Sequence, residues 1–389
     1  MKKDYVIGFL GTYPPKACGI ATFTQDLVRT IENCFAEISP VVIAVGSDEM
    51  VYSSRVILEI QQKQRFSYKK AAQVLNYSPV DLVVLEHEYG IFGGENGEYI
   101  LDFVNELKIP LITTLHTVLP KPLPKQRYIL QELGEKSEKI ITMAYVTKKI
   151  LEEIYHIPAH KIEVVPHGVS LQVQHKSKEN LKEALGYKGR QIISTFGLLS
   201  EGKGLEYGIE AVAKVAKMHP EILYLILGQT HPCVKARDGE AYREKIQNLV
   251  YQLDVEENVK FVNRYLSKEE IGQYLFLSDI YMTPYPDSDQ AVSGTLAYAA
   301  GYGKMIISTP YLYAQEILAD QRGLFARFSD ADSLAEKIEE ILSNPGRKNL
   351  MEEKMAAFGE HMLWDNVAKA YVAIFQNVKA SVENSSWVV

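Results

Sequence analysis

The residues best suited to chemistry lie in a glycine-rich loop, GLLSEGKG (197–204), which ends a predicted strand and precedes a predicted helix. The loop matches the P-loop pattern G-x-x-x-x-G-K, but Gly204 stands where a P-loop needs the hydroxyl that holds magnesium, so we reject a P-loop. Glycines still let backbone N–H groups approach a phosphate, and Lys203 adds a positive charge. The loop therefore indicates a diphosphate site without metal; the alternative is a turn with a solvated lysine.

A second candidate for anion binding is Ser293-Gly294-Thr295, which opens a predicted helix rich in small residues. The N–H groups at the start of a helix are free to bind an anion, although an ordinary N-cap explains the same residue types. Gly301 and Gly303 further on do not form a dinucleotide fingerprint, because the third glycine is absent and a strand follows. A dehydrogenase function therefore loses support.

Polar residues also follow two predicted strands in the first half of the chain. His87 and Glu88 end the segment 81–88, and His116 ends the segment 110–116. Open α/β sheets bind ligands at the carboxyl ends of their strands, so these side chains could act as acid, base or hydrogen-bond donors. A structural histidine is the alternative for each. The H-E-Y sequence lacks the i, i+4 pair of H-E-x-x-H, so we do not predict a metal site.

The elements that must position these residues are short apolar strands alternating with amphipathic helices, a pattern typical of parallel sheets covered on both faces. A polar stretch at about 172–190 separates two series, and each opens with a strand ending at a glycine, a lysine-containing loop and a second glycine before a helix. This repetition predicts an α/β fold of two Rossmann-like domains whose loops face a central cleft. The predicted strands are 5–11, 41–45, 81–87, 110–116, 139–143 and 162–168, then 192–197, 222–228, 258–262, 279–285, 304–309 and 323–328.

Composition excludes several classes of protein. The 389 residues favour two domains, and a net charge of −7 argues against nucleic-acid binding. Cys18, Cys34 and Cys233 have no zinc or C-x-x-C spacing, so we predict neither a disulfide nor a zinc framework. The first fifteen residues lack a signal-peptide core, and no run of about eighteen apolar residues occurs, so we expect a soluble, cytoplasmic protein.

One basic and aromatic segment, QKQRFSYKK (62–70), bears on possible partners. We predict a solvated helix face there, and the alternative is a patch that contacts an acidic acceptor or, peripherally, an anionic membrane.

Together these segments resemble glycosyltransferase family 4, the retaining, nucleotide-sugar-dependent enzymes of the GT-B fold, over nearly the whole chain. In family order, KACGIATFT (16–24) is similar to the glycine-rich loop, TTLHT (113–117) to the strand-end histidine segment, and PHGVS (166–170) to the P-N/H-G-V segment. The loop at 197–204 is similar to G-R-L-x-x-x-K-G. Residues 261–285 are similar to the base pocket and the strand after it, and 364–375 to the closing helix.

The resemblance implies transfer of a sugar from a UDP- or GDP-linked donor to a carbohydrate or lipid-linked acceptor, with no cofactor and no metal. It implies a first domain at 1–180, a donor domain at 181–360 and a C-terminal helix at 361–389 that returns to the first domain. It assigns catalysis to His116, Lys203 and Gln290, and acceptor contacts to His87, Glu88 and Tyr89. Donor contacts are assigned to Gly19, His167, Gly168, Lys203, Arg264, Ser293, Gly294, Thr295 and Tyr298.

The sequence departs from the family pattern at the donor site. Two acidic residues eight positions apart usually contact the donor, and here these positions hold Gln290 and Tyr298. Leu198 replaces the usual arginine, with Arg264 as a candidate substitute. Amide and hydroxyl groups still form hydrogen bonds with a sugar, so we expect an altered but active transferase. The alternatives are a catalytically silent sugar-nucleotide-binding protein and a nucleotide-sugar 2-epimerase.

Overall fold

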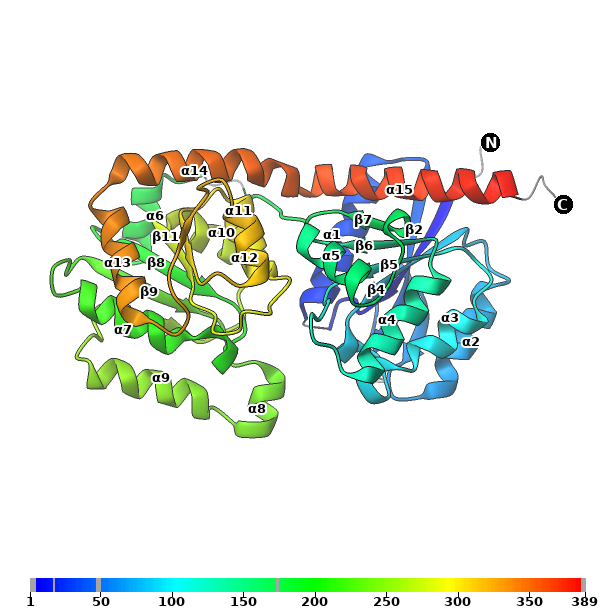
Figure 1. Ribbon diagram of the computed structural model, residues 1–389, viewed down its shortest axis with the longest axis horizontal. Helices are drawn as coiled ribbons and strands as arrows, with labels where there is room; N and C mark the ends of the chain where they lie inside the picture. The colour runs from blue at the N-terminus through cyan, green and yellow to red at the C-terminus, as the bar shows by residue number, and fades with distance from the viewer. Residues whose placement is uncertain (1–4, 17, 47–49, 173–174, 386–389) are drawn as a thin grey trace. The chain divides into compact units, whose positions relative to one another are not determined.

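The computed structural model describes residues 5–16, 18–46, 50–172 and 175–385, without the side chains of Cys233 and Ser385. The chain forms two compact units (Figure 1). Unit 1 comprises Met1–Gly168 and Trp364–Val389, and unit 2 comprises Val169–Leu363. The first change of unit thus comes before the expected residue 180, because the segment after Gly168 is bonded within unit 2. The Val169 N–H donates to the carbonyl of Met362 at 2.7 Å.

Unit 1 is built on a seven-stranded parallel sheet with the strand order β3-β2-β1-β4-β5-β6-β7. The central strands are almost completely buried, as their continuous apolar sequences predict. The strands are β1 (Tyr5–Gly11), β2 (Ile38–Gly46), β3 (Val56–Gln61), β4 (Leu82–His87), β5 (Leu111–Leu115), β6 (Lys139–Thr142) and β7 (Ile162–Val164). The helices are α1 (Gly19–Cys34), α2 (Arg65–Leu75), α3 (Ile100–Glu106), α4 (Pro124–Lys136), α5 (Tyr145–Glu153) and α15 (Trp364–Ser385), with short 3₁₀ turns at Tyr89–Ile91, Glu95–Gly97 and Ala159–Lys161.

The sequence analysis missed strand β3. Its sequence, VILEIQ, begins with three apolar residues; Ile57 and Glu59 are exposed, and only Ile60 is fully buried. The strand lies at the edge of the sheet, where one face remains solvated. A pattern for fully buried strands does not detect such a segment.

Unit 2 is built on a six-stranded parallel sheet with the order β10-β9-β8-β11-β12-β13, and all six strands lie where the sequence predicts them. They are β8 (Gln191–Phe196), β9 (Ile222–Leu227), β10 (Val259–Val262), β11 (Ile280–Thr283), β12 (Ile306–Ser308) and β13 (Leu324–Phe325). The helices are α6 (Lys178–Ala184), α7 (Leu205–Val215), α8 (Pro232–Asp238), α9 (Ala241–Gln252), α10 (Lys268–Leu277), α11 (Gly294–Gly301), α12 (Leu312–Ile317), α13 (Ala331–Leu342) and α14 (Pro345–Gly359), with 3₁₀ turns at Glu201–Lys203 and Glu360–Met362.

The C-terminal helix α15 belongs to unit 1, as expected (Figure 1). The ring of Phe375 packs edge-on against Phe9 of β1, with ring centroids 6.3 Å apart. The hydroxyl of Tyr371 lies 3.2 Å from Thr114 Oγ1 of β5. The last helix thus completes the core of the unit in which the chain begins. Its buried side chains are Trp364, Val367, Ala368, Tyr371, Val372, Ile374, Phe375 and Val378.

The basic segment at 62–70 lies on α2 and the turn before it. Arg65 forms an ion pair with Asp102 at 2.7 Å, and Lys69 one with Glu106 at 3.3 Å. Phe66 is exposed. These contacts fit a solvated helix face, and contact with a membrane remains a prediction.

Candidate functional site

In unit 2, the loops after β8 and β11 converge at the carboxyl edge of the sheet. Gly197 directly follows β8 and has a φ of +134°, a conformation that residues with side chains rarely adopt. A Cβ atom at Gly197 would lie 3.2 Å from Thr295 Cγ2 and 3.7 Å from Lys203 Nζ. The missing side chain therefore allows Lys203 and the start of α11 to approach the end of β8.

Lys203 is held by a tyrosine. Its Nζ donates a hydrogen bond to the hydroxyl of Tyr285 at 2.6 Å and lies 4.3 Å from the centre of the same ring. The Tyr285 ring is buried and stacks on Tyr311 with centroids 5.2 Å apart. Among the described residues, no carboxylate forms an ion pair with Lys203, so its positive charge is not neutralised within the unit.

The start of α11 joins Lys203 through hydroxyl groups. Thr295 Oγ1 lies 2.9 Å from the Tyr285 hydroxyl and 3.3 Å from Ser293 Oγ. Ser293 caps the helix by accepting the N–H of Leu296 at 3.3 Å, and Gly294 is the first residue of the helix. We call Lys203, Tyr285, Ser293 and Thr295 the Lys203 cluster. An anion at this place would meet one ammonium group and the N-terminal end of α11.

The positions where the family usually has carboxylates lie beside this cluster. Tyr298 packs edge-on against Phe196, the last residue of β8. Gln290 precedes α11, and its Nε2 donates to the carbonyl of Val292 at 3.2 Å. Its own backbone carbonyl accepts the N–H of Tyr313 at 3.1 Å. Two neutral polar side chains thus occupy the positions of the two acids.

Two further contacts at this edge bear on anion binding. In α7, the helix after Lys203, the N–H of Leu205 donates to the Tyr242 hydroxyl at 3.2 Å and is not free to bind an anion. Arg264 does not join the Lys203 cluster in any described contact. It forms an ion pair with Glu270 at 2.5 Å, which together with backbone bonding lowers the pKa of Glu270 to about 2. Neither contact can be read from the sequence. Tyr242 lies 37 residues after Leu205. The ion pair between Arg264 and Glu270 is local but follows no motif.

In unit 1, His116 follows β5 and pairs with a buried carboxyl group. Its Nε2 lies 2.8 Å from Oε2 of Glu86 in β4. Glu86 is completely buried, and burial raises its pKa above the ordinary value. The sequence analysis missed this pairing because thirty residues separate the two. The register offers a signal, since Glu86 pairs with Thr114 and His116 lies two positions further on the same face.

Phe23 of α1 brings the other predicted donor contacts of unit 1 together. Its ring packs edge-on against His116 at 4.7 Å, His167 at 5.3 Å and Trp364 at 5.0 Å between centroids. Gly19 starts the same helix, is exposed, and has open space where a Cβ would lie. The three segments that resemble the family thus share one region of unit 1.

Gly168 has a packing role within this region. A Cβ on Gly168 would lie 2.4 Å from three atoms of the Trp364 ring, so the first residue of α15 requires a glycine there. Nδ1 of the neighbouring His167 lies 2.8 Å from the Gly168 carbonyl, and burial lowers the pKa of His167 to about 4. Donor contacts of these two residues remain a prediction.

The predicted acceptor residues form ring contacts and hydrogen bonds that stabilise the loop after β4. His87 is fully buried, stacked on Phe92 and edge-on to Tyr89, and burial lowers its pKa to about 3. The ring is therefore a neutral part of the core and offers no surface to an acceptor. Glu88 accepts hydrogen bonds from Tyr89 N–H at 3.0 Å and from Thr117 Oγ1 at 2.5 Å. The buried Tyr89 donates its hydroxyl to the Gln126 carbonyl.

Two of the hollows on unit 2 lie at opposite edges of its sheet. One, of about 360 Å³, lies at the carboxyl ends of β9 and β10. Arg243 donates hydrogen bonds to Thr230, Glu240 and Asn263 in this hollow. These polar lining groups are therefore held in place by bonds within the protein. Its lining residues are Gln229, Thr230, Pro232, Lys235, Glu240, Arg243 and Asn263.

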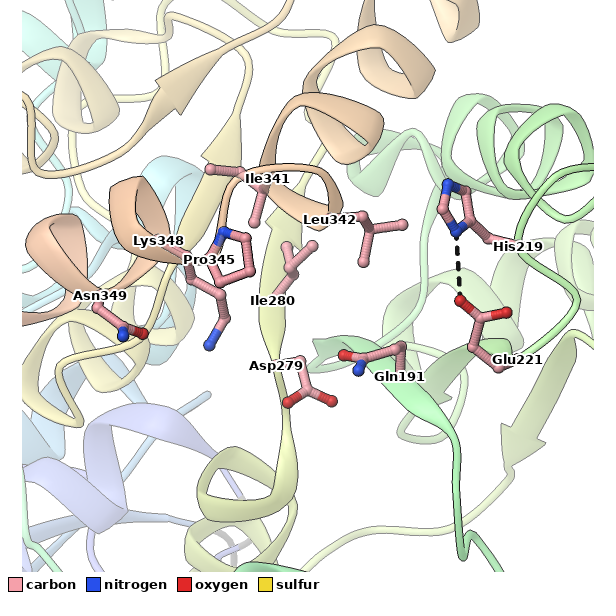
Figure 2. A pocket seen from close by; sticks show the side chains of 10 residues that line it. All are labelled: Gln191, His219, Glu221, Asp279, Ile280, Ile341, Leu342, Pro345, Lys348 and Asn349. Atoms are coloured by element: carbon pink, nitrogen blue, oxygen red, sulfur yellow. Dashed lines mark hydrogen bonds and ion pairs between the residues drawn. The ribbon is translucent and has the colours of Figure 1, made fainter.

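The other hollow, of about 330 Å³, lies at the amino ends of the strands, away from the Lys203 cluster (Figure 2). Gln191 and Asp279 precede or begin the neighbouring strands β8 and β11, and Lys348 comes from α14. Both oxygens of Asp279 are engaged, one by Lys178 and the other by Lys182 and the N–H of Ile192. This carboxylate therefore connects elements of the fold.

The described residues contain no group of three or more His, Cys, Asp or Glu side chains that could hold a metal ion. Cys18 and Cys34 are free thiols, and the side chain of Cys233 lies outside the described part. In the described ranges, no helix has the length and apolar character needed to cross a membrane.

Two family models match consecutive parts of the chain. The model for Glycosyltransferase Family 4 matches residues 18–173, and that for Glycosyl transferases group 1 matches residues 177–361. The chain belongs to glycosyltransferase family 4. The matched segments include all the residues assigned above to catalysis and donor binding.

Two relatives are identical to this chain at about a fifth of the aligned residues. The uncharacterized glycosyltransferase MJ1178 of Methanocaldococcus jannaschii is 22% identical over 379 residues, which cover 94% of this chain and 96% of that protein. A D-inositol 3-phosphate glycosyltransferase of Corynebacterium urealyticum is 21% identical over 267 residues, covering 67% of this chain and 62% of the relative.

Solved structures share the fold at lower identity. Anabaena HepE (Alr3699) in complex with UDP-glucose matches with a TM-score of 0.76 and 14% identity, over 96% of this chain and 99% of that chain. Sucrose-phosphate synthase of Thermosynechococcus elongatus matches with a TM-score of 0.77 and 14% identity, over 97% and 100%. The fold is GT-B, with two Rossmann-like domains.

Proposed function

We propose that the protein is a retaining glycosyltransferase that moves a sugar from a nucleotide diphosphate donor to a carbohydrate or lipid-linked acceptor in the cytoplasm. The observation that carries the proposal is the Lys203 cluster, where an ammonium group without a carboxylate partner among the described residues lies beside the start of α11. Family membership and the UDP-glucose complex of HepE, a protein of the same fold, support a nucleotide-sugar donor.

In the proposed reaction, the acceptor oxygen attacks the anomeric carbon from the face that the diphosphate leaves, so the anomeric configuration is retained. The bond from the anomeric carbon to the diphosphate breaks, and the diphosphate takes the acceptor proton. The negative charge that grows on the diphosphate is stabilised by Lys203 and by N–H groups at the start of α11. Each charge-assisted hydrogen bond of this kind contributes about 1.5–3 kcal/mol.

The sugar and the base of the donor are assigned to other groups. His116 in unit 1 and Gln290 in unit 2 are proposed to bind hydroxyls of the sugar, and Tyr298 to bind the ribose. Gln290 and Tyr298 are neutral, so they recognise hydroxyls through single amide or hydroxyl bonds in place of a carboxylate. The hollow beside Asn263 is the proposed place of the base, at the same edge of the sheet.

The test compares Lys203→Met with Lys188→Met, a control because Lys188 is exposed and pairs with Glu183 on the surface. We expect Lys203→Met to lower transfer by about 10- to 100-fold or more and to weaken UDP or GDP binding. The control should leave both unchanged. Calorimetry measures binding, and NMR of the product of a nucleotide-sugar panel measures transfer and anomeric configuration.

Three results would contradict parts of the proposal. Unchanged binding and turnover in Lys203→Met would remove Lys203 from the donor site. Binding without transfer across the panel would favour the silent binding protein, for which Gln290 and Tyr298 in place of acids are the specific observation. Release of an epimerised donor would favour the 2-epimerase.

A further inference from the structure

Inside unit 1 lies a carboxyl group with one oxygen that forms no hydrogen bond. Glu86 is completely buried, and its Oε2 lies 2.8 Å from Nε2 of His116. Its Oε1 is also buried and has no hydrogen-bond partner among the described residues. Burial of an ionised oxygen without a donor is costly, so the protonation state of this group needs a physical reason.

The groups around Glu86 provide no compensating charge. His87 on β4 and His167 after β7 have pKa values lowered by burial to about 3 and about 4, so both rings are neutral at pH 7. Tyr371 on α15 is also neutral, because burial and the nearby Glu86 raise its pKa well above the ordinary value. His116 is therefore the partner that decides the state of Glu86.

We propose that Glu86 is a positioning residue in its protonated form, which donates a hydrogen bond to Nε2 of His116 and so keeps the ring proton of His116 on Nδ1. In this state Oε1 belongs to a neutral acid, whose burial costs much less than that of a carboxylate. A neutral imidazole has one donor and one acceptor nitrogen, so His116 presents Nδ1 as a fixed N–H donor.

The direction of the pKa shift of Glu86 agrees with the protonated state. Burial raises the pKa of Glu86, and the hydrogen bond with His116 acts in the opposite direction without cancelling that rise. The ring of His116 cannot turn freely to exchange its two nitrogens, because Phe23 packs edge-on against it at 4.7 Å. The orientation and the tautomer of the ring are thus fixed together.

The functional part of the inference rests on the proposed function, in which His116 contacts the donor sugar. An Nδ1–H group donates a hydrogen bond to a sugar oxygen, whereas the other tautomer offers a lone pair and could only accept one. Glu86 would then act on the reaction only through His116.

The first experiment reads the tautomer directly in the full-length protein without substrate. Histidine labelled with ¹⁵N in both ring positions is incorporated, and the His116 signals are assigned by their loss in His116→Gln. Two-bond ¹H–¹⁵N spectra should show a protonated Nδ1 and a bare Nε2. A proton on Nε2, or on both nitrogens, overturns the inference.

Variants of Glu86 test the consequence for transfer. Glu86→Gln keeps an N–H donor facing Nε2, and we expect it to retain the tautomer and kcat within about threefold. Glu86→Leu removes the donor, and we expect loss of the single tautomer and a kcat lower by about 10- to 100-fold with little change in the KM for the donor. Tyr371→Phe is the control near Glu86 and should change neither readout.

These outcomes separate the inference from the proposed function. A single Nδ1–H tautomer in a protein without transfer activity would support the pairing and reject the function. A proton on Nε2 in an active transferase would reject the role of Glu86 alone. Equal loss of kcat in Glu86→Gln and Glu86→Leu would show that a carboxylate is required and would also overturn the inference, and thermal unfolding of each variant identifies any loss due to misfolding.

Discussion

Lys203 lies on the ring and hydroxyl of Tyr285, and this support is specific to one side chain. Tyr285 is completely buried, stacks on Tyr311 and bridges Lys203 to Thr295 through its hydroxyl. The hydroxyl thus fixes an ammonium group without cancelling its charge. A carboxylate in the same place would neutralise Lys203 and weaken its attraction for a diphosphate.

Tyr285→Phe tests this support, because it removes the hydroxyl and keeps the stacked ring. We expect the free energy of unfolding to fall by about 1.5–3 kcal/mol, the usual contribution of a hydrogen bond to a charged group. UDP affinity should fall by about 3- to 30-fold as Lys203 and Thr295 lose their common partner. Urea unfolding and calorimetry measure the two effects, and unchanged UDP binding would show that the bridge has no part in the donor site.

Single residues show the limits of prediction from sequence. The type and place of Lys203, His116 and Thr295 follow from motifs at strand ends. Tyr285 and Glu86 do not, because each acts through a partner more than twenty residues away. Gly168 matches a donor-binding motif, but its contact in the structure is with the ring of Trp364. A motif identifies the residue, and only the packed structure identifies its neighbour.

At the scale of elements, Asp279 connects α6 to two strands. Its carboxylate accepts hydrogen bonds from Lys178 and Lys182 of α6 and from the N–H of Ile192 in β8, and it directly precedes β11. Burial raises the pKa of Asp279, but the charge of Lys178 and the hydrogen bonds outweigh burial, and the pKa lies below its ordinary value of 3.8.

Asp279→Asn should lower the free energy of unfolding by about 3–5 kcal/mol at pH 7, because it leaves two lysines without their counter-charge. The folded pKa is lower than the unfolded one, so the stabilisation is fully present above about pH 4 and is lost as the pH falls through the folded value. The difference between wild type and variant in urea unfolding should therefore shrink from pH 7 to pH 3.

The control for this experiment is Glu183→Gln on the same helix, which breaks an exposed pair with Lys188. Exposed pairs contribute little, so its effect should be much smaller and nearly independent of pH. An equal loss in both variants, or a loss in Asp279→Asn that stays constant with pH, would contradict the structural role of the Asp279 carboxylate.

Strands were predictable from the sequence where both of their faces are buried. All six strands of unit 2 and six of unit 1 follow from continuous apolar segments. The edge strand β3 escaped because it is only partly buried: Ile57 and Glu59 are exposed, and Ile60 alone is fully buried.

At the scale of the whole molecule, the decisive prediction is that the last helix belongs with the first residues. The apolar side chains of α15 recur with helical spacing, and the structure buries them in unit 1. The boundary expected at residue 180 came from a polar stretch, whereas backbone bonding assigns the chain to unit 2 from Val169 onward. A polar stretch in the sequence thus locates the boundary between the two units only approximately.

A chain ending at Leu363 should leave unit 1 unfolded, because it exposes the partners of eight buried side chains of α15. Each large apolar side chain contributes about 1.5–3 kcal/mol, and together they match the whole stability of a domain of about 5–15 kcal/mol. Limited proteolysis and binding of a hydrophobic dye measure the change. A chain ending at Ser385 is the control, and a shortened chain as protease-resistant as the control would contradict the prediction.

The return of α15 to unit 1 also bears on synthesis. On the ribosome, residues 169–363 form an uninterrupted segment, so the second unit has all its strands before the first has its final helix. Phe9 and Thr114 emerge early, but their partners Phe375 and Tyr371 emerge more than 250 residues later. The amino-terminal sheet keeps part of its core uncovered until α15 has been synthesised, and an uncovered apolar surface of this kind promotes premature association.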